Sequence, residues 1–261
     1  MLPILQIGPL AIQTPGLILL LGLWFGLTLA EKLAQIDRVI DPNAIYNLAL
    51  TALVAGILGA RLLYVARYPD IFFNDPLSLV SPNTAMLDAF GGLVTGGLAA
   101  LIYGQRRKLP LWPALDALTP ALSVLFIAAG LAHFASGDAF GIPAHLPWSI
   151  RLWGESRHPT QLYETLLAAG IAVLVWPRRR SEQPAGVRFL AFVALSAFAR
   201  ILVETFRADS TLIFGSLRTA QVIAWGILAI STQWIATRLK HQSTTQPLEE
   251  AKPCPYLEKQ S

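Results

Sequence analysis

Two short stretches of the sequence hold ionisable residues at spacings that could form a binding or catalytic site. The first runs from Gly137 to Glu164 and is the longest polar passage between two apolar runs. Among its polar and charged side chains are Asp138, Arg151, Glu155, Arg157, His158, Gln161 and Glu164. Charged groups are costly in hydrocarbon, so we expect this stretch to lie in water, at a headgroup surface or in a paired polar cavity. We interpret it as a site open to one face of a membrane.

The second stretch places Arg200, Glu204 and Arg207 at positions i, i+4 and i+7 of an apolar run, which is one face of a helix. Ionisable residues inside a membrane segment usually line a cavity. Guanidinium groups match the oxygen atoms of phosphate, so this stripe favours binding of an anionic lipid headgroup. An internal salt bridge that ties helices together is the alternative.

Other polar residues have a structural interpretation beside the functional one. The segment 157–164 enters a helix, where Gln161 and Glu164 share a face, and it could be a polar helix cap at headgroup level. Arg61 with Tyr64 could be a snorkelling arginine and its aromatic neighbour. We expect Asp116 to complement a helix dipole rather than to react.

Composition indicates an integral membrane protein. The 261 residues are 54% hydrophobic and 14% charged, whereas a soluble domain carries roughly 25% charged residues. The net charge of +4 could suggest nucleic acid, but lysine and arginine cluster at the ends of apolar runs, which is typical of membrane topology. We therefore expect no nucleic-acid partner. The single cysteine, Cys254, excludes an intrachain disulfide and a CxxC metal site, and no cleavable signal peptide is evident.

Seven apolar runs approach or reach the roughly 20 residues that a hydrocarbon core requires. They cover about Pro15–Ala34, Pro42–Ala66, Asp88–Tyr103, Trp112–Phe134, Thr160–Trp176, Val187–Phe206 and Leu217–Leu239. We expect residues 1–13 and 67–87 at the interface and a disordered tail over 240–261. The predicted fold is all-α: one polytopic membrane domain, 1–239, with about seven transmembrane helices around an outward-facing polar cavity.

The basic clusters set the predicted orientation. Threading seven spans puts Lys32 and Arg38, Arg106–Lys108, Arg178–Arg180, and Arg238 with Lys240 on one side, which should be cytoplasmic. The N-terminus is then outside, the C-terminus inside, and the polar segment 136–158 extracytoplasmic. We expect the outer ends of the second, fifth and sixth spans to converge on one cavity there.

Four motifs resemble one family. "RHPTQLYE" at 157–164 resembles the RHPSQLYE-type motif of the bacterial prolipoprotein diacylglyceryl transferases, and "FARILVETFR" at 198–207 resembles their FRxxVExxR segment. "GARLLYV" at 59–65 resembles their second-helix GAR motif, and "HFASGDAFG" at 133–141 stands where they carry NFxNGExxG. The resemblance runs in the same order from about Gly16 to about Ile230. The family has seven spans with the N-terminus outside.

The resemblance implies a reaction in the bacterial cytoplasmic (inner) membrane. The family moves a diacylglyceryl group from phosphatidylglycerol to the thiol of a lipobox cysteine, which forms a thioether and releases glycerol-1-phosphate. The implied partners are phosphatidylglycerol or another anionic phospholipid, the signal peptide of a preprolipoprotein and membrane lipid. No metal or organic cofactor is implied.

Residue roles follow from the resemblance together with the chemistry. The implied catalytic residues are His133, Asp138, Arg200 and Glu204. The implied substrate-binding residues are Arg61, Thr95, Ser136, Arg157, His158, Gln161, Glu164 and Arg207. His133 is our hypothesis for the group that takes the thiol proton, oriented by Asp138, because imidazole is a base near neutral pH. The alternative is that His133 caps a helix or bonds a loop carbonyl.

The chain departs from the family pattern at several positions. An arginine of the family signature aligns with Gly130, its two asparagines with His133 and Ser136, and its glutamate with Asp138. A histidine of the third span aligns with Thr95, and a tyrosine of the first span aligns with Pro15. Two alternatives therefore stand beside an active transferase: a non-catalytic paralogue that binds an anionic lipid or lipopeptide, and an enzyme with another lipid donor or acceptor.

Overall fold

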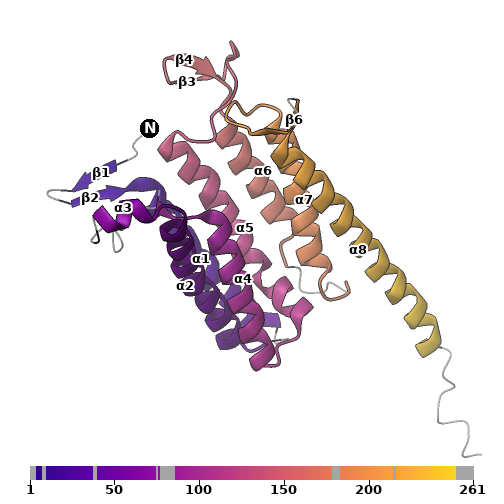
Figure 1. Ribbon diagram of the computed structural model, residues 1–261. Helices are drawn as coiled ribbons and strands as arrows, with labels where there is room; N and C mark the ends of the chain where they lie inside the picture. Colours follow the sequence, from indigo (N-terminus) through magenta and orange to yellow (C-terminus); the bar gives the residue numbers. More distant parts are fainter. Residues whose placement is uncertain are drawn as a thin grey trace, which may run out of the picture.

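The chain forms a helical bundle in the computed structural model, which describes residues 4–7, 10–37, 40–74, 76, 86–177, 183–213 and 216–250 (Figure 1). The long helices are α1 (Thr14–Asp37), α2 (Pro42–Arg67), α4 (Ala89–Arg106), α5 (Leu111–Ser136), α6 (Thr160–Leu174), α7 (Val187–Glu204) and α8 (Thr219–Glu250). A short helix, α3 (Pro69–Asn74), follows α2.

Three antiparallel strand pairs sit at helix ends. They are β1 (Ile4–Ile7) with β2 (Leu10–Gln13), β3 (Ile150–Leu152) with β4 (Glu155–Arg157), and β5 (Leu212–Ile213) with β6 (Leu217–Arg218). The β3–β4 hairpin turns through Trp153 and Gly154, both with positive φ, the conformation that two-residue hairpin turns require. Each pair is small, so the protein is all-α in class.

Among the described residues, four helical segments are long and apolar enough to cross a membrane. They are Thr14–Gln35, Pro42–Arg67, Leu111–Ser136 and Thr219–Lys240. The segment α7 carries Arg188, Arg200 and Glu204 within its 18 residues, and α6 has only 15 residues. These lengths and charges explain why α6 and α7 are weaker candidates, and a total of seven spans stays a prediction.

The structure differs from the sequence expectation in the tail and adds detail in two other segments. Helix α8 continues to Glu250, although we expected a disordered tail from residue 240. Within the segments 1–13 and 67–87, expected at the interface, the structure forms the paired strands β1 and β2 and the helix α3, and the interfacial location stays a prediction. Cys254, Arg38, Arg178–Arg180 and residues 77–85 lie outside the described residues.

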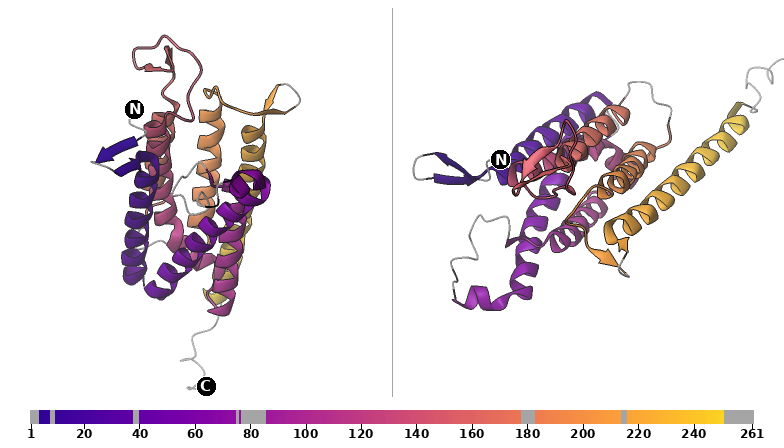
Figure 2. Two further views of the ribbon diagram at one scale, coloured as in Figure 1. Left: turned by 60° about the vertical axis from the view of Figure 1, so that its left-hand side comes forward. Right: turned by 90° about the horizontal axis from the view of Figure 1, so that it is seen from above.

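Helix α5 lies centrally and packs against α1 on one side and against α6 and α7 on another, whereas α2 pairs with α4 and α7 pairs with α8 (Figure 2). Close helix contacts depend on small residues, as expected in membranes, where small side chains let backbones approach. At Gly96, for example, a Cβ atom would lie 2.8 Å from the carbonyl oxygen of Ala52. The bundle is therefore held by tight pairing of neighbouring helices.

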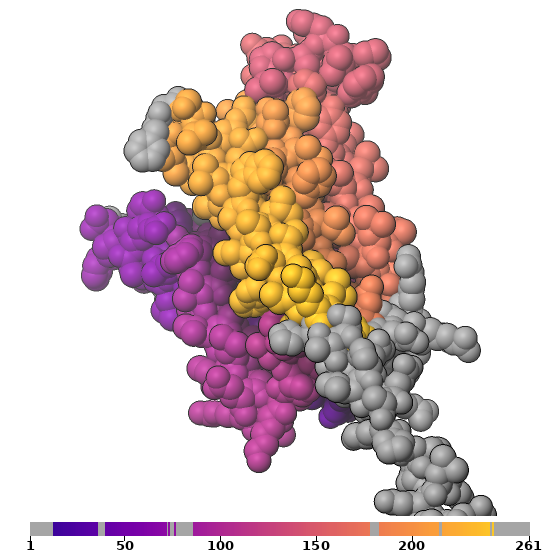
Figure 3. Space-filling model, turned by 90° about the vertical axis from the view of Figure 1, so that its right-hand side faces the viewer, coloured from indigo at the N-terminus to yellow at the C-terminus, as the bar shows by residue number. Residues whose placement is uncertain are grey.

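The end of α5, the start of α6, the end of α7 and the start of α8 all lie at one end of the bundle (Figure 1). The segment with the β3–β4 hairpin projects beyond this end, and α8 runs along the face of the bundle that Figure 3 shows. Arg106, Arg107 and Lys108, which connect α4 to α5, lie at the opposite end of the bundle. The structure thus separates the polar stretch from this basic cluster, as the threading of the sequence requires.

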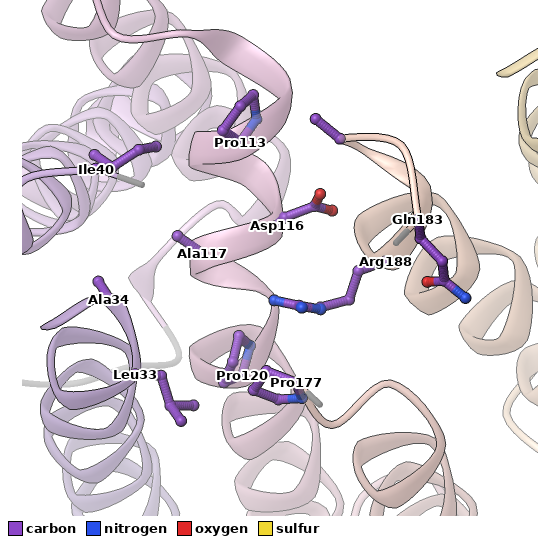
Figure 4. A pocket seen from close by; sticks show the side chains of 11 residues that line it. Leu33, Ala34, Ile40, Pro113, Asp116, Ala117, Pro120, Pro177, Gln183 and Arg188 are labelled. Carbon is purple, nitrogen blue, oxygen red and sulfur yellow. The ribbon is translucent and has the colours of Figure 1, made fainter. Parts of the chain in front are cut away.

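Asp116 joins α5 to the start of α7 at the end with the basic residues. Its carboxylate oxygen atoms accept hydrogen bonds from the backbone N–H groups of Gly186 (2.6 Å) and Phe189 (2.8 Å). The side chain borders a cavity of about 190 Å³ that Arg188 also lines (Figure 4). Asp116 therefore caps the N-terminus of α7 instead of its own helix, and it lies at the other end of the bundle from the polar stretch.

Candidate functional site

One carboxylate, that of Glu164, stands at the centre of a charged cluster between α5, α6 and α7. Its Oε2 atom lies 2.9 Å from Nδ1 of His133, which is on α5. Its Oε1 atom accepts hydrogen bonds from Nη1 of Arg200 (3.2 Å) and from Nη1 of Arg207 (3.0 Å). Both oxygen atoms of Glu164 are therefore engaged, and one residue links imidazole to two guanidinium groups.

The helix α7 adds a second carboxylate to the cluster. Glu204 is 2% exposed, and its Oε2 atom lies 3.0 Å from Nη2 of Arg200, one helical turn away. The same oxygen lies 3.9 Å from Nε of Arg207. The expected stripe of Arg200, Glu204 and Arg207 thus exists as an ion-pair network. Arg200 remains the more open of the two arginines, with 39% of its side chain exposed against 12% for Arg207.

Arg207, just past the end of α7, is held from two sides. Its Nε and Nη2 atoms donate to Oδ1 and Oδ2 of Asp209 at 2.9 and 2.8 Å, in a bidentate pair. Burial lowers the pKa of Arg207, but the hydrogen bonds and charge of Asp209 outweigh it and leave the pKa raised. Burial raises the pKa of Asp209, and the hydrogen bonds and charge of Arg207 outweigh it and leave that pKa lowered. Both groups are therefore charged at neutral pH.

The loop after α5 is fixed by polar residues of the predicted motif. Gly137 ends α5 in the left-handed conformation (φ 82°), and its N–H donates to the carbonyl oxygen of His133 at 2.9 Å. Gln161, fully buried, donates from Nε2 to the carbonyl oxygen of Asp138 at 2.8 Å. Ser136 donates to the carbonyl oxygen of His133 and accepts from the N–H of Asp138. Ser136 and Gln161 thus position the loop.

Arg157 and His158 connect the loop after α5 with the residue before Arg207. Arg157 pairs with Glu155 at 2.6 Å, donates to the carbonyl oxygen of Gly141 at 3.2 Å, and stacks on Phe140. His158 packs on Phe206 and lies 3.3 Å, Nδ1 to hydroxyl, from Tyr163. Backbone hydrogen bonds join the loop after α5 to the residues after α7. The N–H of Ile142 donates to the carbonyl oxygen of Phe206, and the N–H of Ala208 donates to that of Phe140. These contacts fix where α7 ends.

Two apolar cavities open beside the cluster and share Phe126, Ser196 and Arg200. The first has about 190 Å³, lies between α5, α6 and α7, and is lined by His133, Glu164 and Arg200 among apolar residues. The second has about 400 Å³ and reaches α8. A charged cluster at the wall of apolar space can hold a molecule with an anionic head and a hydrocarbon body.

Arg61 and Thr95 are not brought into this cluster. Arg61 on α2 donates to the carbonyl oxygen of Met86 at 3.2 Å. Thr95 on α4 donates to the carbonyl oxygen atoms of Gly91 (2.7 Å) and Ala55 (3.1 Å), and it fills the space beside Gly59. Neither residue is among those that line the two cavities at Arg200. Of the three spans expected to converge, the fifth and sixth (α6 and α7) meet at the cluster, α5 joins them, and Arg61 of the second span (α2) is not part of it.

The partner expected for His133 needs correction. We expected Asp138 to orient this imidazole, but Glu164 lies 2.9 Å from it, while Asp138 is exposed and contributes its carbonyl oxygen to Gln161. The reason is geometric: His133 is in the last turn of α5 and contacts α6, whereas Asp138 comes after the left-handed turn at Gly137 that ends the helix. Proximity in sequence suggested the wrong carboxylate.

Sequence reasoning also missed Asp209 and Arg218. Arg218, in β6, donates to the carbonyl oxygen of Arg207 at 2.9 Å. An acidic residue two positions after Arg207 was the available signal for the pair with Asp209. Nothing in the spacing of Arg218 indicated its contact. Within the described ranges no group of three His, Cys, Asp or Glu side chains could hold a metal ion.

Comparison with known proteins gives a consistent result across the chain. Residues 3–237 match the family model described as prolipoprotein diacylglyceryl transferase. A phosphatidylglycerol–prolipoprotein diacylglyceryl transferase of Symbiobacterium thermophilum is 35% identical over 242 residues, which cover 87% of this chain and 88% of the relative. Proteins of the same name from Synechococcus elongatus and Thermosynechococcus vestitus are 32% and 30% identical and cover 87% and 93% of this chain, and 85% and 94% of the relatives.

Proposed function

Because this chain belongs to the prolipoprotein diacylglyceryl transferase family, we propose that the cluster around Glu164 transfers a diacylglyceryl group from phosphatidylglycerol to the thiol of a lipobox cysteine. The observation that carries the proposal is the arrangement of imidazole and two guanidinium groups on one carboxylate, at the wall of an apolar cavity. Its parts match what the reaction needs: a proton acceptor, cations for phosphate and space for hydrocarbon.

The reaction balances within these residues. The cysteine sulfur attacks the sn-3 carbon of the lipid, a carbon–sulfur bond forms, and the bond from that carbon to the phosphate oxygen breaks. Glycerol-1-phosphate leaves with the electron pair, and the thiol proton passes to His133. Glu164 orients the imidazole and stabilises it once it is protonated. Arg200 faces the cavity and stabilises the negative charge that develops on the departing phosphate.

We place this site on the extracytoplasmic side of the bacterial inner membrane. The protein is a membrane protein by its family and its apolar helices. The Arg106–Lys108 cluster lies at the end away from the site, and basic clusters favour the cytoplasm. The proposed partners are phosphatidylglycerol and the signal peptide of a preprolipoprotein, and we propose about seven spans around the cavity.

Complementation tests the proposal in cells. The gene should restore lipoprotein modification in bacteria depleted of their own transferase, and Arg200→Gln should not, at equal abundance in the membrane. Asp70→Asn, which changes an exposed acid on α3, is the matched control and should complement fully. Failure of the wild-type protein to complement, despite normal abundance, would argue against a transferase of this substrate pair.

One observation favours a second function. The family pattern places an arginine at Gly130, but here the backbone of Thr165 lies so close that a Cβ atom at Gly130 would be 3.0 Å from its nitrogen. No arginine fits there, so one cation of the family pattern is missing from this site. A non-catalytic lipid-binding protein would bind phosphatidylglycerol and release no glycerol-1-phosphate, which distinguishes it from the proposed transferase.

A further inference from the structure

Arg200, within α7, and Arg207, just after its end, have different surroundings. Arg207 uses Nε and Nη2 for Asp209 and Nη1 for Glu164, so each of its three nitrogen atoms already has an acceptor. Its backbone is held as well, because its carbonyl oxygen accepts from Arg218 and Gly141 bridges to it. Only 12% of its side chain is exposed. Arg207 is therefore fixed in place by its neighbours.

Arg200 has the opposite character. It reaches Glu164 and Glu204 with one nitrogen each, and 39% of its side chain is exposed. It lines both apolar cavities beside the cluster, whereas Arg207 lines neither. A phosphate that arrived from these cavities would meet the guanidinium group of Arg200 first.

We propose that Asp209 is a positioning residue, which neutralises Arg207 and locks it as a structural support of Glu164, and that the phosphate is held by Arg200 without Arg207. This inference rests on the proposed transfer reaction and assigns a role to a carboxylate outside the motifs of the sequence. It differs from our expectation that the stripe of Arg200, Glu204 and Arg207 binds a lipid headgroup as a unit.

The division of roles follows from charge and geometry. A bidentate guanidinium–carboxylate pair fixes both position and plane of the arginine. With Nε and Nη2 so occupied, Nη1 can point only towards Glu164, which keeps Oε2 of Glu164 facing His133. Without Asp209, Arg207 loses the bidentate pair that fixes its plane and keeps only the contacts with Glu164 and Glu204. It is then free to turn, so Glu164 and the imidazole lose their fixed orientation. Lipid binding through Arg200 would remain.

The experiment compares two measurements on purified protein in detergent. Turnover with phosphatidylglycerol and a lipobox peptide should show a kcat reduced about tenfold or more in Asp209→Asn, from the loss of charge-assisted hydrogen bonds. KM for phosphatidylglycerol should change less than about twofold. Asp209→Glu should recover most of kcat, since it keeps the charge, and Asp70→Asn should behave as wild type.

Binding of phosphatidylglycerol without peptide, followed by native mass spectrometry, is the second measurement. Asp209→Asn and Arg207→Gln should bind like wild type, while Arg200→Gln should lose binding. Weakened binding in Arg207→Gln, a raised KM in Asp209→Asn, or no rescue by Asp209→Glu would overturn the inference. If the wild type binds lipid but has no turnover, the proposed transfer reaction fails, and the binding measurement still decides between the two arginines.

Discussion

Glu164 is the residue on which the proposed chemistry depends, because it contacts the imidazole and both guanidinium groups at once. A thiol near its free pKa of about 8.5 is mostly protonated at neutral pH, so transfer needs a proton acceptor. His133 is the imidazole of the cluster, and it lies at the cavity wall with 40% of its side chain exposed. It can therefore be reached by a thiol from the cavity.

His133→Gln should lower kcat about 100-fold or more, the usual contribution of a general base. The glutamine retains a hydrogen-bonding side chain of similar reach but cannot take the proton. His145→Gln, at an exposed position of the loop before β3, is the control and should leave kcat unchanged. The measurement is turnover in detergent at equal concentrations of folded wild type and variants. Undiminished turnover in His133→Gln would show that this histidine serves only the loop.

The pair of Arg207 and Asp209 should stabilise the protein across the physiological pH range. The hydrogen bonds and charge of Arg207 leave the pKa of Asp209 below its ordinary 3.8, and those of Asp209 leave the pKa of Arg207 raised, so both are charged from about pH 5 to about pH 8. A lowered carboxyl pKa gives stability that is present above the unfolded value and is lost as pH falls through the folded value.

The expected result is a lower Tm for Asp209→Asn than for wild type, by the same amount at about pH 5 and about pH 8. The difference should shrink only below about pH 4, where Asp209 of the wild type becomes protonated. Thermal unfolding in detergent measures it. A difference that already shrinks between about pH 7 and about pH 5 would mean that the pair has another titrating partner.

The contact between α5 and α6 is the element that brings His133 to Glu164. Gly130 lies one turn before His133 and contacts Thr165, which follows Glu164. The absence of a side chain at Gly130 allows the helices to approach, and the distance of 2.9 Å from His133 to Glu164 depends on this approach. The position that departs from the family pattern therefore has a structural role here.

Gly130→Ala should cost about 1–3 kcal/mol of stability, as overpacked cores do, and should reduce turnover by separating His133 from Glu164. Gly170→Ala in α6 is the matched control, because a Cβ atom there meets nothing within 4 Å. It should be neutral or should stabilise the helix by up to about 1 kcal/mol. Thermal unfolding and turnover of both variants give the comparison, and equal behaviour of the two would contradict the role of Gly130.

The sequence predicted the positions of helices best and the side-chain contacts between different helices least well. The start of α6 at Thr160 and that of α7 at Val187 match the expected runs, since Pro159 and Gly186 end the preceding segments. The end of α8 was missed because the polar residues after Leu239 still permit helix. The pairs of Glu164 with His133 and of Asp116 with α7 join distant segments, and residue spacing along one segment carries no information about them.

At the scale of the whole molecule, the orientation in the membrane decides which compartment reaches the site. The site and the β3–β4 hairpin lie at one end of the bundle, and Arg106–Lys108 lie at the other. The sequence predicted this separation from the positions of basic residues alone. It also predicted the family and the stripe on α7, but it grouped Arg61 and Thr95 with the site, although the structure places them between α2 and α4.

Thiol labelling of intact cells tests the orientation. Cys254 is the only cysteine, and a membrane-impermeant reagent should not label it if the C-terminus is cytoplasmic. His145→Cys, made in a Cys254→Ser background, should be labelled because the loop faces outward and the position is exposed. Cell lysis should make Cys254 reactive and serves as the control for reactivity. The reverse pattern would place the site in the cytoplasm.

The most direct test of the central claim is transfer by the purified protein. Phosphatidylglycerol and a synthetic lipobox peptide are supplied in detergent, and the diacylglyceryl thioether and free glycerol-1-phosphate are both quantified by mass spectrometry. We predict equal amounts of the two products, with none from a peptide whose cysteine is replaced by serine and none from Arg200→Gln. Binding of phosphatidylglycerol with neither product formed would contradict the claim and identify the protein as a lipid-binding member of its family.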